Sequence, residues 1–186
     1  MIKGEILKRG DVIKIGGQLC RVMNVEFGGS AKFGRTVHIK YRNVEGGSTH
    51  EVSVGGNEMF EEAAVQKSEM EYLYSDDDFY YFMDTSSYEQ SPVPRDLVGE
   101  AGRFLRENRR LTIELAEGKP VNVIFPDALE VRVAEAPPGL HHQESSTGKE
   151  VILENGIKIL APQFITAGDL IRINPLTGKY VDRVKK

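Results

Sequence analysis

The stretch Glu71-Tyr-Leu-Tyr-Ser-Asp-Asp-Asp-Phe-Tyr-Tyr-Phe-Met-Asp-Thr-Ser-Ser-Tyr88 holds five of the seven tyrosines in this sequence. Met70, Tyr72 and Tyr74 recur at every second position, which is the periodicity of a half-buried strand. Three consecutive aspartates then supply turn chemistry, and a second β-prone run follows from Phe79 to Met83. The stretch therefore predicts a hairpin of two strands around an acidic turn.

Short apolar runs separated by Gly, Asn-Gly or Asp-rich turns recur along the rest of the chain. This pattern is typical of small all-β domains rather than of alternating strands and helices. The further predicted strands are Val12–Ile15, Leu19–Phe27, Thr36–Asn43, Thr49–Val54, Leu111–Leu115, Lys119–Ile124, Leu129–Glu135, Val151–Leu153, Lys158–Ala161 and Leu170–Asn174. Asn155-Gly156, between two of them, predicts a hairpin with a type I′ turn because this pair tolerates positive φ angles.

One helix is predicted in the middle of the chain. The apolar residues Leu97, Ala101, Phe104, Leu105 and Leu111 recur there near helical spacing. Its arginines are Arg103, Arg106, Arg109 and Arg110. They would either touch RNA phosphates or form a solvated face balanced by Glu100 and Glu107, and the solvated face is the favoured interpretation.

The chain divides into three units, with boundaries near Ala64 and Asp127. The predicted domains are 1–64, 65–127 and 128–186, each about 60 residues long, so we expect them to pack on their neighbours or share strands. The two end domains contain a weak echo of each other. Residues 10–15 and 168–173 both read Gly-Asp, an apolar residue, Ile, a basic residue and Ile, which indicates the same turn entering a strand in two small barrels.

The composition favours a folded cytoplasmic protein, since 40% of the 186 residues are hydrophobic and 28% are charged. Charges recur from the first residues, and no apolar run approaches the roughly 20 residues needed to span a bilayer. We therefore expect neither export nor membrane insertion. The single cysteine, Cys20, is interpreted as a buried core residue in a strand, and this usage fits a reducing compartment.

The net charge of −4 argues against a surface built wholly for nucleic acid, but the charge is spread unevenly. Residues 1–65 hold nine Lys and Arg against eight Asp and Glu, residues 66–126 hold seven against twelve, and residues 127–186 hold eight against eight. Residues 27–44 carry four basic side chains and no acid. This stretch is therefore predicted to meet phosphates locally.

Catalytic and metal sites are not indicated. None of His38, His50 and the pair His141-His142 has zinc-motif spacing with the single cysteine, and no set of acid, base and nucleophile can be assembled. Asp76 to Asp78 lack the Gly and distant Glu of a calcium loop, and the glycines around residue 30 lack the order of a phosphate-binding loop. We expect no enzyme activity, no cofactor and no metal.

The order Tyr-Leu-Tyr, acidic turn, Tyr-Phe-Met-Asp and then Tyr88-Glu89-Gln90 resembles the middle domain of the bacterial translation elongation factor P family. Glu26-Phe27, a loop and the strand His38–Asn43 are similar to that family's Glu-Phe, tip loop and basic strand. Further similar segments are 129–131, 138–140, 162–165, 168–169 and 178–184. The resemblance covers the whole chain, and its third domain points to the bacterial type.

This resemblance implies an elongated or L-shaped all-β protein of three consecutive small barrels, an N-terminal SH3- or KOW-like barrel followed by two of OB type. It implies a monomer that binds both ribosomal subunits beside peptidyl-tRNA. The first domain would lie near the acceptor arm of that tRNA and the third near the small subunit. There the protein would promote peptide-bond formation and relieve stalling at consecutive prolines.

In the same alignment Lys32 falls on the family's functional tip lysine, directed to the peptidyl-transferase centre and open to a lysine-modifying enzyme. The remaining tip-loop residues are Gly28, Gly29, Ser30, Ala31, Phe33 and Gly34. Candidate RNA contacts follow at Arg35, Lys40 and Arg42.

Two segments depart from the family pattern. Ser30-Ala31-Lys32-Phe33 replaces a tip that is commonly Pro-Gly-Lys-Gly, and 141–145 replace a Lys-Gly-Asp-Thr-Ala segment. A divergent paralogue with a specialised ribosome or tRNA role is therefore one alternative. A general single-stranded nucleic-acid binder built on OB barrels is the other.

Overall fold

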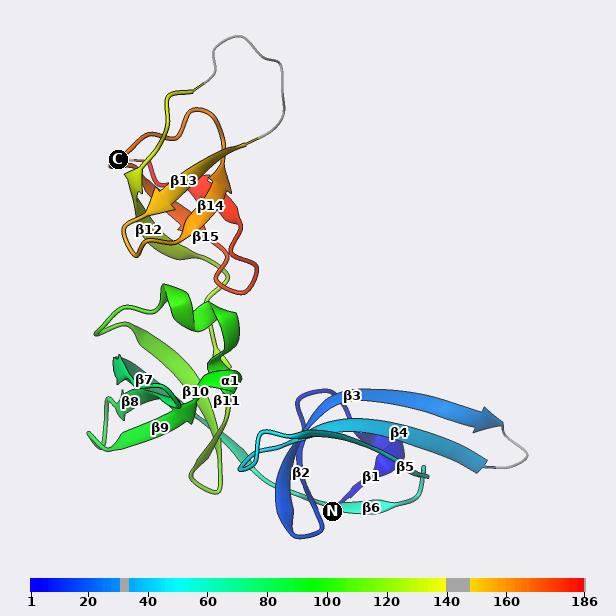
Figure 1. Cartoon of the computed structure of the whole chain (residues 1–186). Coiled ribbons are helices and arrows are strands. Elements are labelled where there is room, and N and C mark those ends of the chain that lie inside the picture. Colours follow the sequence, from blue (N-terminus) through cyan, green and yellow to red (C-terminus); the bar gives the residue numbers. More distant parts are fainter. Residues whose placement is uncertain (31–33, 140–147, 186) are drawn as a thin grey trace.

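The structure is a computed structural model that describes residues 1–30, 34–139 and 148–185. It consists almost wholly of antiparallel strands, gathered in three small curled sheets that follow one another along the chain (Figure 1). The predicted all-β class is confirmed.

The first sheet has the order β1-β6-β2-β3-β4-β5. Its elements are β1 (Ile2–Lys3), the 3-10 turn η1 (Gly4–Ile6), β2 (Val12–Ile15), β3 (Gln18–Ser30), β4 (Gly34–Asn43), β5 (Thr49–Gly55) and β6 (Met59–Glu62). Alternate residues of these strands face inward, and Ile13, Val22, Val37 and Ile39 are fully buried there.

The second sheet has the order β11-β10-β7-β8-β9. Its strands are β7 (Val65–Ser75), β8 (Phe79–Asp84), β9 (Gln90–Pro94), β10 (Arg110–Ala116) and β11 (Lys119–Ile124). The tyrosine-rich stretch forms the β7–β8 hairpin, as predicted. Asp76 closes its acidic turn, because the carboxylate accepts hydrogen bonds from the backbone N–H groups of Asp78 (2.9 Å) and Phe79 (2.7 Å).

The predicted helix of the middle region is wrong in extent. Only α1 (Arg95–Val98) is α-helical, and it passes into the 3-10 helix η2 (Gly99–Phe104), while Leu111 lies in β10. Gly99 has φ +67°, outside the right-handed helical region, so the helix cannot continue through it. Apolar spacing alone therefore overestimated the helix.

The third sheet has the order β14-β13-β12-β15-β16. Its strands are β12 (Leu129–Glu135), β13 (Lys149–Leu153), β14 (Lys158–Ala161), β15 (Leu170–Ile173) and β16 (Tyr180–Arg183). The predicted β13–β14 hairpin is confirmed, but its type I′ turn is not. Gly156 alone has positive φ (+81°), and its N–H bonds the carbonyl of Leu153 at 2.8 Å, so the loop is a three-residue turn closed by a left-handed glycine.

The echo between the two ends of the chain reflects one local structure used twice. The N–H groups of Gly10 and Gly168 donate to the carbonyls of Val22 and Val133, each at 2.8 Å. The carboxylates of Asp11 and Asp169 accept from the backbone N–H three residues earlier, at 2.8 and 2.9 Å. Each motif turns the chain into a strand, as predicted.

A buried apolar cluster with side chains from both sheets joins the first sheet to the second. Val12 and Leu19 of the first sheet share a buried cluster with Ala63 of the connection and with Ala116 and Val121 of the second. Across the other junction, the buried Phe104 of η2 belongs to the core of the third sheet. The second and third sheets lie one above the other and the first projects sideways, which gives the L shape that the resemblance implied (Figure 1).

Among the described residues, no helix is long and apolar enough to cross a membrane. Cys20 is buried in β3 with 1% of its surface exposed, which confirms its interpretation as a core residue. Burial raises the pKa of its thiol, so the thiolate form is disfavoured.

Candidate functional site

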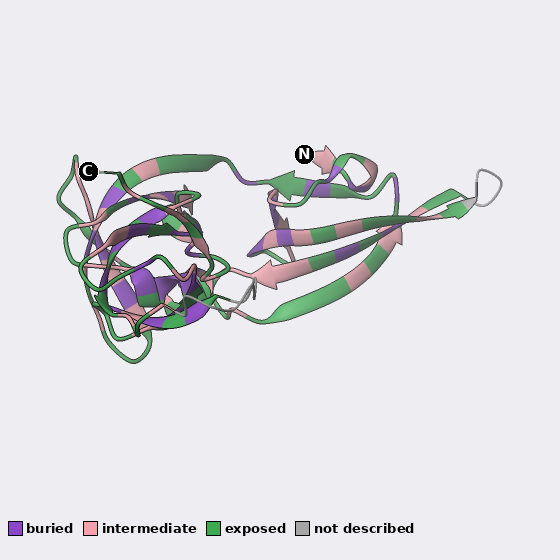
Figure 2. Ribbon diagram, turned by 90° about the horizontal axis from the view of Figure 1, so that it is seen from above, coloured by how far each residue is buried: buried purple, intermediate pink, exposed green. Residues whose placement is uncertain are grey.

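The β3–β4 hairpin is the most extended feature of the first sheet and reaches away from the other two sheets (Figures 1 and 2). Its ladder pairs Cys20 with Asn43 at the base and Ser30 with Gly34 at the far end. Cys20 and Val22 are buried near the base, whereas Phe27 nearer the tip is 56% exposed. The base is thus anchored in a core, and the tip projects from it.

Two glycines form the neck below the tip. Gly29 and Gly34 have φ values of +90° and +84°. A Cβ on Gly29 would lie 2.4 Å from the carbonyl oxygen of Gly34, so the two backbones approach too closely for any other residue. This neck brings the two ends of the tip loop together at Ser30 and Gly34.

The predicted tip residues Ala31, Lys32 and Phe33 lie outside the described residues, as does the His141-His142 segment. Gly28, Gly29, the Ser30 backbone and Gly34 were predicted as loop residues, but they belong to the paired strands β3 and β4, which therefore extend further toward the tip than predicted.

Arg35 and Lys40 are exposed on β4. The carbonyl of Arg35 accepts from the N–H of Gly56 at 2.8 Å, which ties the neck to the loop after β5. Lys40 forms an ion pair of 3.4 Å with Glu51 of β5, and both side chains are at least half exposed. Exposed pairs of this kind exchange easily with other anions, so Lys40 stays accessible to phosphate.

Residues 27–44 contain no acidic residue, but in the structure acidic side chains of neighbouring residues lie beside them. Glu26 lies opposite His38 in the ladder, and Glu51 lies opposite Lys40. His38 in turn shares a hydrogen bond of 2.7 Å with Ser53. The hairpin face therefore carries both signs of charge, which composition along the chain could not show because strand pairing brings in distant residues.

Arg42 is engaged elsewhere. Its guanidinium donates to the carboxylate of Asp96 in α1 and, at 3.4 Å, to the Asp96 carbonyl, and only 15% of its side chain is exposed. Sequence reasoning missed Asp96, which is 54 positions away. The contact joins the first sheet to the second, and an RNA contact by Arg42 stays a prediction.

A second arginine fixes the base of the hairpin. Arg21 of β3 donates to the carbonyl of Val121 in β11 at 3.3 Å. Burial lowers the pKa of Arg21, since the charged form loses solvation there. Together with the shared apolar cluster, this bond fixes the direction in which the hairpin leaves the second sheet.

Metal ligands are not gathered in the described part of the hairpin. Within 1–30, 34–139 and 148–185, no group of three or more His, Cys, Asp or Glu side chains is arranged to hold a metal ion. The hairpin offers a projecting tip and a mixed-charge face, which suit contact with another macromolecule.

Comparison with known proteins gives matches along the whole chain. Sequence profiles described as the elongation factor P KOW-like domain, the elongation factor P OB domain and the elongation factor P C-terminal domain match residues 4–60, 65–123 and 129–183. A protein of Caldanaerobacter subterraneus subsp. tengcongensis named elongation factor P is 38% identical over 188 residues, covering 99% of this chain and 100% of its own. One of Kocuria rhizophila with the same name is 33% identical over 187 residues, covering 100% of both.

Among solved structures, one titled eukaryotic translation initiation factor 5A from Methanococcus jannaschii covers 67% of this chain and 95% of its own. Its TM-score is 0.48 at 18% identity.

Proposed function

This chain belongs to the elongation factor P family, a family of ribosome-associated translation factors rather than enzymes, and we propose that it relieves stalling at consecutive prolines. In this proposal the protein binds beside peptidyl-tRNA and contacts both ribosomal subunits. The tip of the β3–β4 hairpin is directed to the peptidyl-transferase centre, where Lys32 is the functional residue.

The projecting hairpin is the observation that carries the proposal. Its tip is held by the glycine neck at Gly29 and Gly34, far from the buried base of the strands. A narrow two-stranded projection can enter a confined site that a whole domain cannot. A lysine at its end would supply a flexible cation with three hydrogen-bond donors for RNA backbone oxygens.

Proline explains why such a contact would speed a reaction that the ribosome itself catalyses. The fixed φ and secondary amine of proline limit the geometries from which a peptide bond forms. Holding the peptidyl-tRNA in a reactive orientation lowers that entropic barrier. The protein would supply orientation, and a covalent extension of Lys32 by a modifying enzyme would lengthen its reach.

Arg35 and Lys40 would dock the hairpin on RNA phosphates, since both side chains are exposed along β4. The acidic second sheet would face away from RNA. The proposal is completed by a cytoplasmic location and a monomeric state.

Of the alternatives, a specialised paralogue would use the same hairpin with a tip altered at Ala31 and Phe33, and would serve other stall sequences. A general single-strand binder is less well supported. Tyr72 and Tyr80 of the second sheet are buried, and Tyr74 and Tyr81 stack on each other with ring centroids 4.6 Å apart. The buried rings cannot stack on bases, and the exposed ones, Tyr74 (49%) and Tyr88 (72%), lie in the acidic middle third of the chain, which repels a nucleic-acid backbone.

The test is translation in a reconstituted system of two reporters that differ only in a run of consecutive prolines. Protein purified from its native host should raise the yield of the proline reporter alone. Lys32→Ala should abolish that gain while circular dichroism and the unfolding midpoint stay unchanged, because a tip side chain contributes little to the core. Lys67→Ala, an exposed lysine of β7, is the matched control.

If the Lys32→Ala variant raised the yield of the proline reporter as much as the wild type does, Lys32 would not be the functional residue. Wild-type protein that relieves stalling on other sequences but not on prolines would favour the paralogue.

A further inference from the structure

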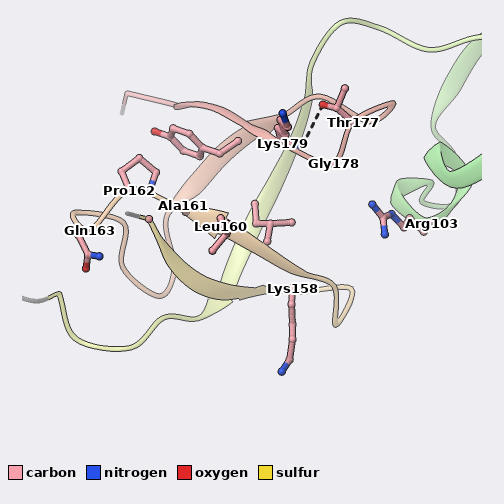
Figure 3. A pocket seen from close by; sticks show the side chains of 12 residues that line it. Arg103, Lys158, Leu160, Ala161, Pro162, Gln163, Thr177, Gly178 and Lys179 are labelled. Carbon is pink, nitrogen blue, oxygen red and sulfur yellow. Dashed lines mark hydrogen bonds between the residues drawn. The ribbon is translucent and has the colours of Figure 1, made fainter. Parts of the chain in front are cut away.

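A groove of about 780 Å³ runs along one edge of the third sheet (Figure 3). One side is β14, from Lys158 to Ala161, and the other is the turn at 177–179 before β16. Arg103 of η2 faces it from the second part of the molecule (Figure 3). Elements far apart in the sequence thus form a single groove.

The strand at this groove is an edge strand. β14 pairs with β13 on one side and stands at the end of the sheet order, and its other edge faces β16 without pairing with it. Ile159 and Ala161 face the core, whereas Leu160 is 68% exposed, the largest apolar exposure in the strand. An edge strand offers backbone N–H and C=O groups that an extended segment of another chain can pair with.

The charge at the groove has one sign. Arg103, Lys158 and Lys179 line it, and none of its lining residues is an Asp or Glu. Lys158 pairs with Glu150 at 3.1 Å and Arg103 with Glu100 at 3.9 Å, both at exposed positions where a ligand carboxylate can compete. Lys179 has no ion pair within the described part of the chain. The groove is therefore complementary to an acidic ligand.

Apolar surface next to these cations favours a peptide over an oligonucleotide. Leu160 and Pro162 lie along β14 and just beyond it. Bases bind single-strand sites by stacking on exposed aromatic rings. β13 and β14 contain no aromatic residue, and Tyr180, which also lines the groove, is partly buried against the core of the third sheet.

We propose that the groove is a docking site for an extended acidic segment of a partner protein, which adds to the free edge of β14 as a further strand. Lys158 and Leu160 are two positions apart and lie on the same outward face of β14. The segment that fits best therefore carries, at every second position, an acidic and an apolar residue in turn, on the face that it shares with them. Its apolar side chains meet Leu160 and Pro162, and its carboxylates meet Lys179, Lys158 and Arg103.

The test uses the isotope-labelled full-length protein and a short synthetic peptide with the repeat Glu-Ser-Val-Ser, called the Glu-Val peptide, followed by nuclear magnetic resonance at low salt. Amide signals of 158–161 and 177–180 should shift on titration. Lys179→Glu should weaken this peptide about fivefold and strengthen the matching Lys-Val peptide, whereas Lys67→Glu, on β7, should change neither. A Glu-Val peptide N-methylated at alternate residues should lose binding, because strand addition needs its N–H groups.

The proposal would be overturned if the Glu-Val peptide did not bind, or if it shifted only amide signals outside 158–161 and 177–180. Equal binding of the N-methylated peptide would also overturn it, as would tighter binding of a uridine oligonucleotide at 158–161 and 177–180. Leu160→Ser provides a second variant at an exposed position, and it should weaken the Glu-Val peptide without loss of fold. Lys32→Ala should bind this peptide as the wild type does, so the outcome is independent of stalling relief.

Discussion

At the scale of single residues, the hairpin tip depends on the backbone freedom of Gly29. Its φ is positive, and a Cβ at this position would lie only 2.4 Å from the carbonyl oxygen of Gly34, which leaves no room for a side chain. Gly28, one residue earlier, has open contacts, since its Cβ would lie 3.5 Å from the ring of His38. The two neighbours therefore form a matched pair for substitution.

Gly29→Ala should lower the free energy of unfolding by about 1–3 kcal/mol and reduce stalling relief, because the neck must open to accept the methyl group. Gly28→Ala should stay within about 0.5 kcal/mol of the wild type. Urea unfolding and the proline reporter measure both effects. Equal behaviour of the two variants would show that the neck geometry is not required.

These residue-level features differ in how far the sequence predicted them. The glycines were predicted from their place between two β-prone runs, whereas Lys32 was singled out by the resemblance to the family's tip lysine. The ion pairs of Lys40 and Arg42 were not, because Glu51 and Asp96 reach them only through strand pairing and the packing of α1. Local sequence therefore predicts turns, but it does not predict ion-pair partners that come from other strands or helices.

At the scale of elements, strands with alternating or β-branched residues were predicted well, and short edge strands were missed. β1 has two residues and β9 contains two prolines, so neither carries a periodic signal, and both exist because a neighbour pairs with them. The helix failed for the converse reason, since apolar spacing continued across Gly99 where the backbone does not.

The β7–β8–β9 meander has a carboxylate whose ionisation contributes to stability. Asp84 accepts from the hydroxyl of Ser68 and from the backbone N–H groups of Ser86 (2.7 Å) and Ser87 (2.9 Å). These bonds, led by that of Ser68, hold the pKa of Asp84 below its ordinary value of 3.8. A lowered native pKa gives stability above the unfolded-state pKa that is lost as the pH falls through the native value.

Asp84→Asn should therefore unfold at lower urea concentration near neutral pH, and its stability should fall less than that of the wild type between about pH 5 and pH 2. Urea titrations across that range measure the slope. Asp77→Asn is the control, since Asp77 is exposed and lies outside these hydrogen bonds. An unchanged slope in Asp84→Asn would contradict this role.

At the scale of the whole molecule, the direction of the hairpin depends on the junction of the first two sheets. Lys119 of β11 pairs with Glu45, 74 positions away, and Arg42 pairs with Asp96. Such pairs could not be predicted from one sequence.

We propose that the domains end near 64 and 127, because the strands of the three sheets fall within 2–62, 65–124 and 129–183.

The junction predicts that Arg42 and Asp96 act together. Arg42→Ala and Asp96→Ala should each lower ribosome affinity to a similar degree, and the double variant should be little worse than either. The coupling in urea unfolding should be about 1 kcal/mol or less, since Asp96 is 56% exposed. A loss of affinity from Arg42→Ala with none from Asp96→Ala would instead make Arg42 a direct RNA contact.

The most direct test of the central claim is a cryo-electron microscopy structure of this protein bound to ribosomes stalled on consecutive prolines. The account predicts that the β3–β4 hairpin lies beside the acceptor end of peptidyl-tRNA, with Lys32 directed to the peptidyl-transferase centre. A bound protein whose hairpin points away from that tRNA would contradict it.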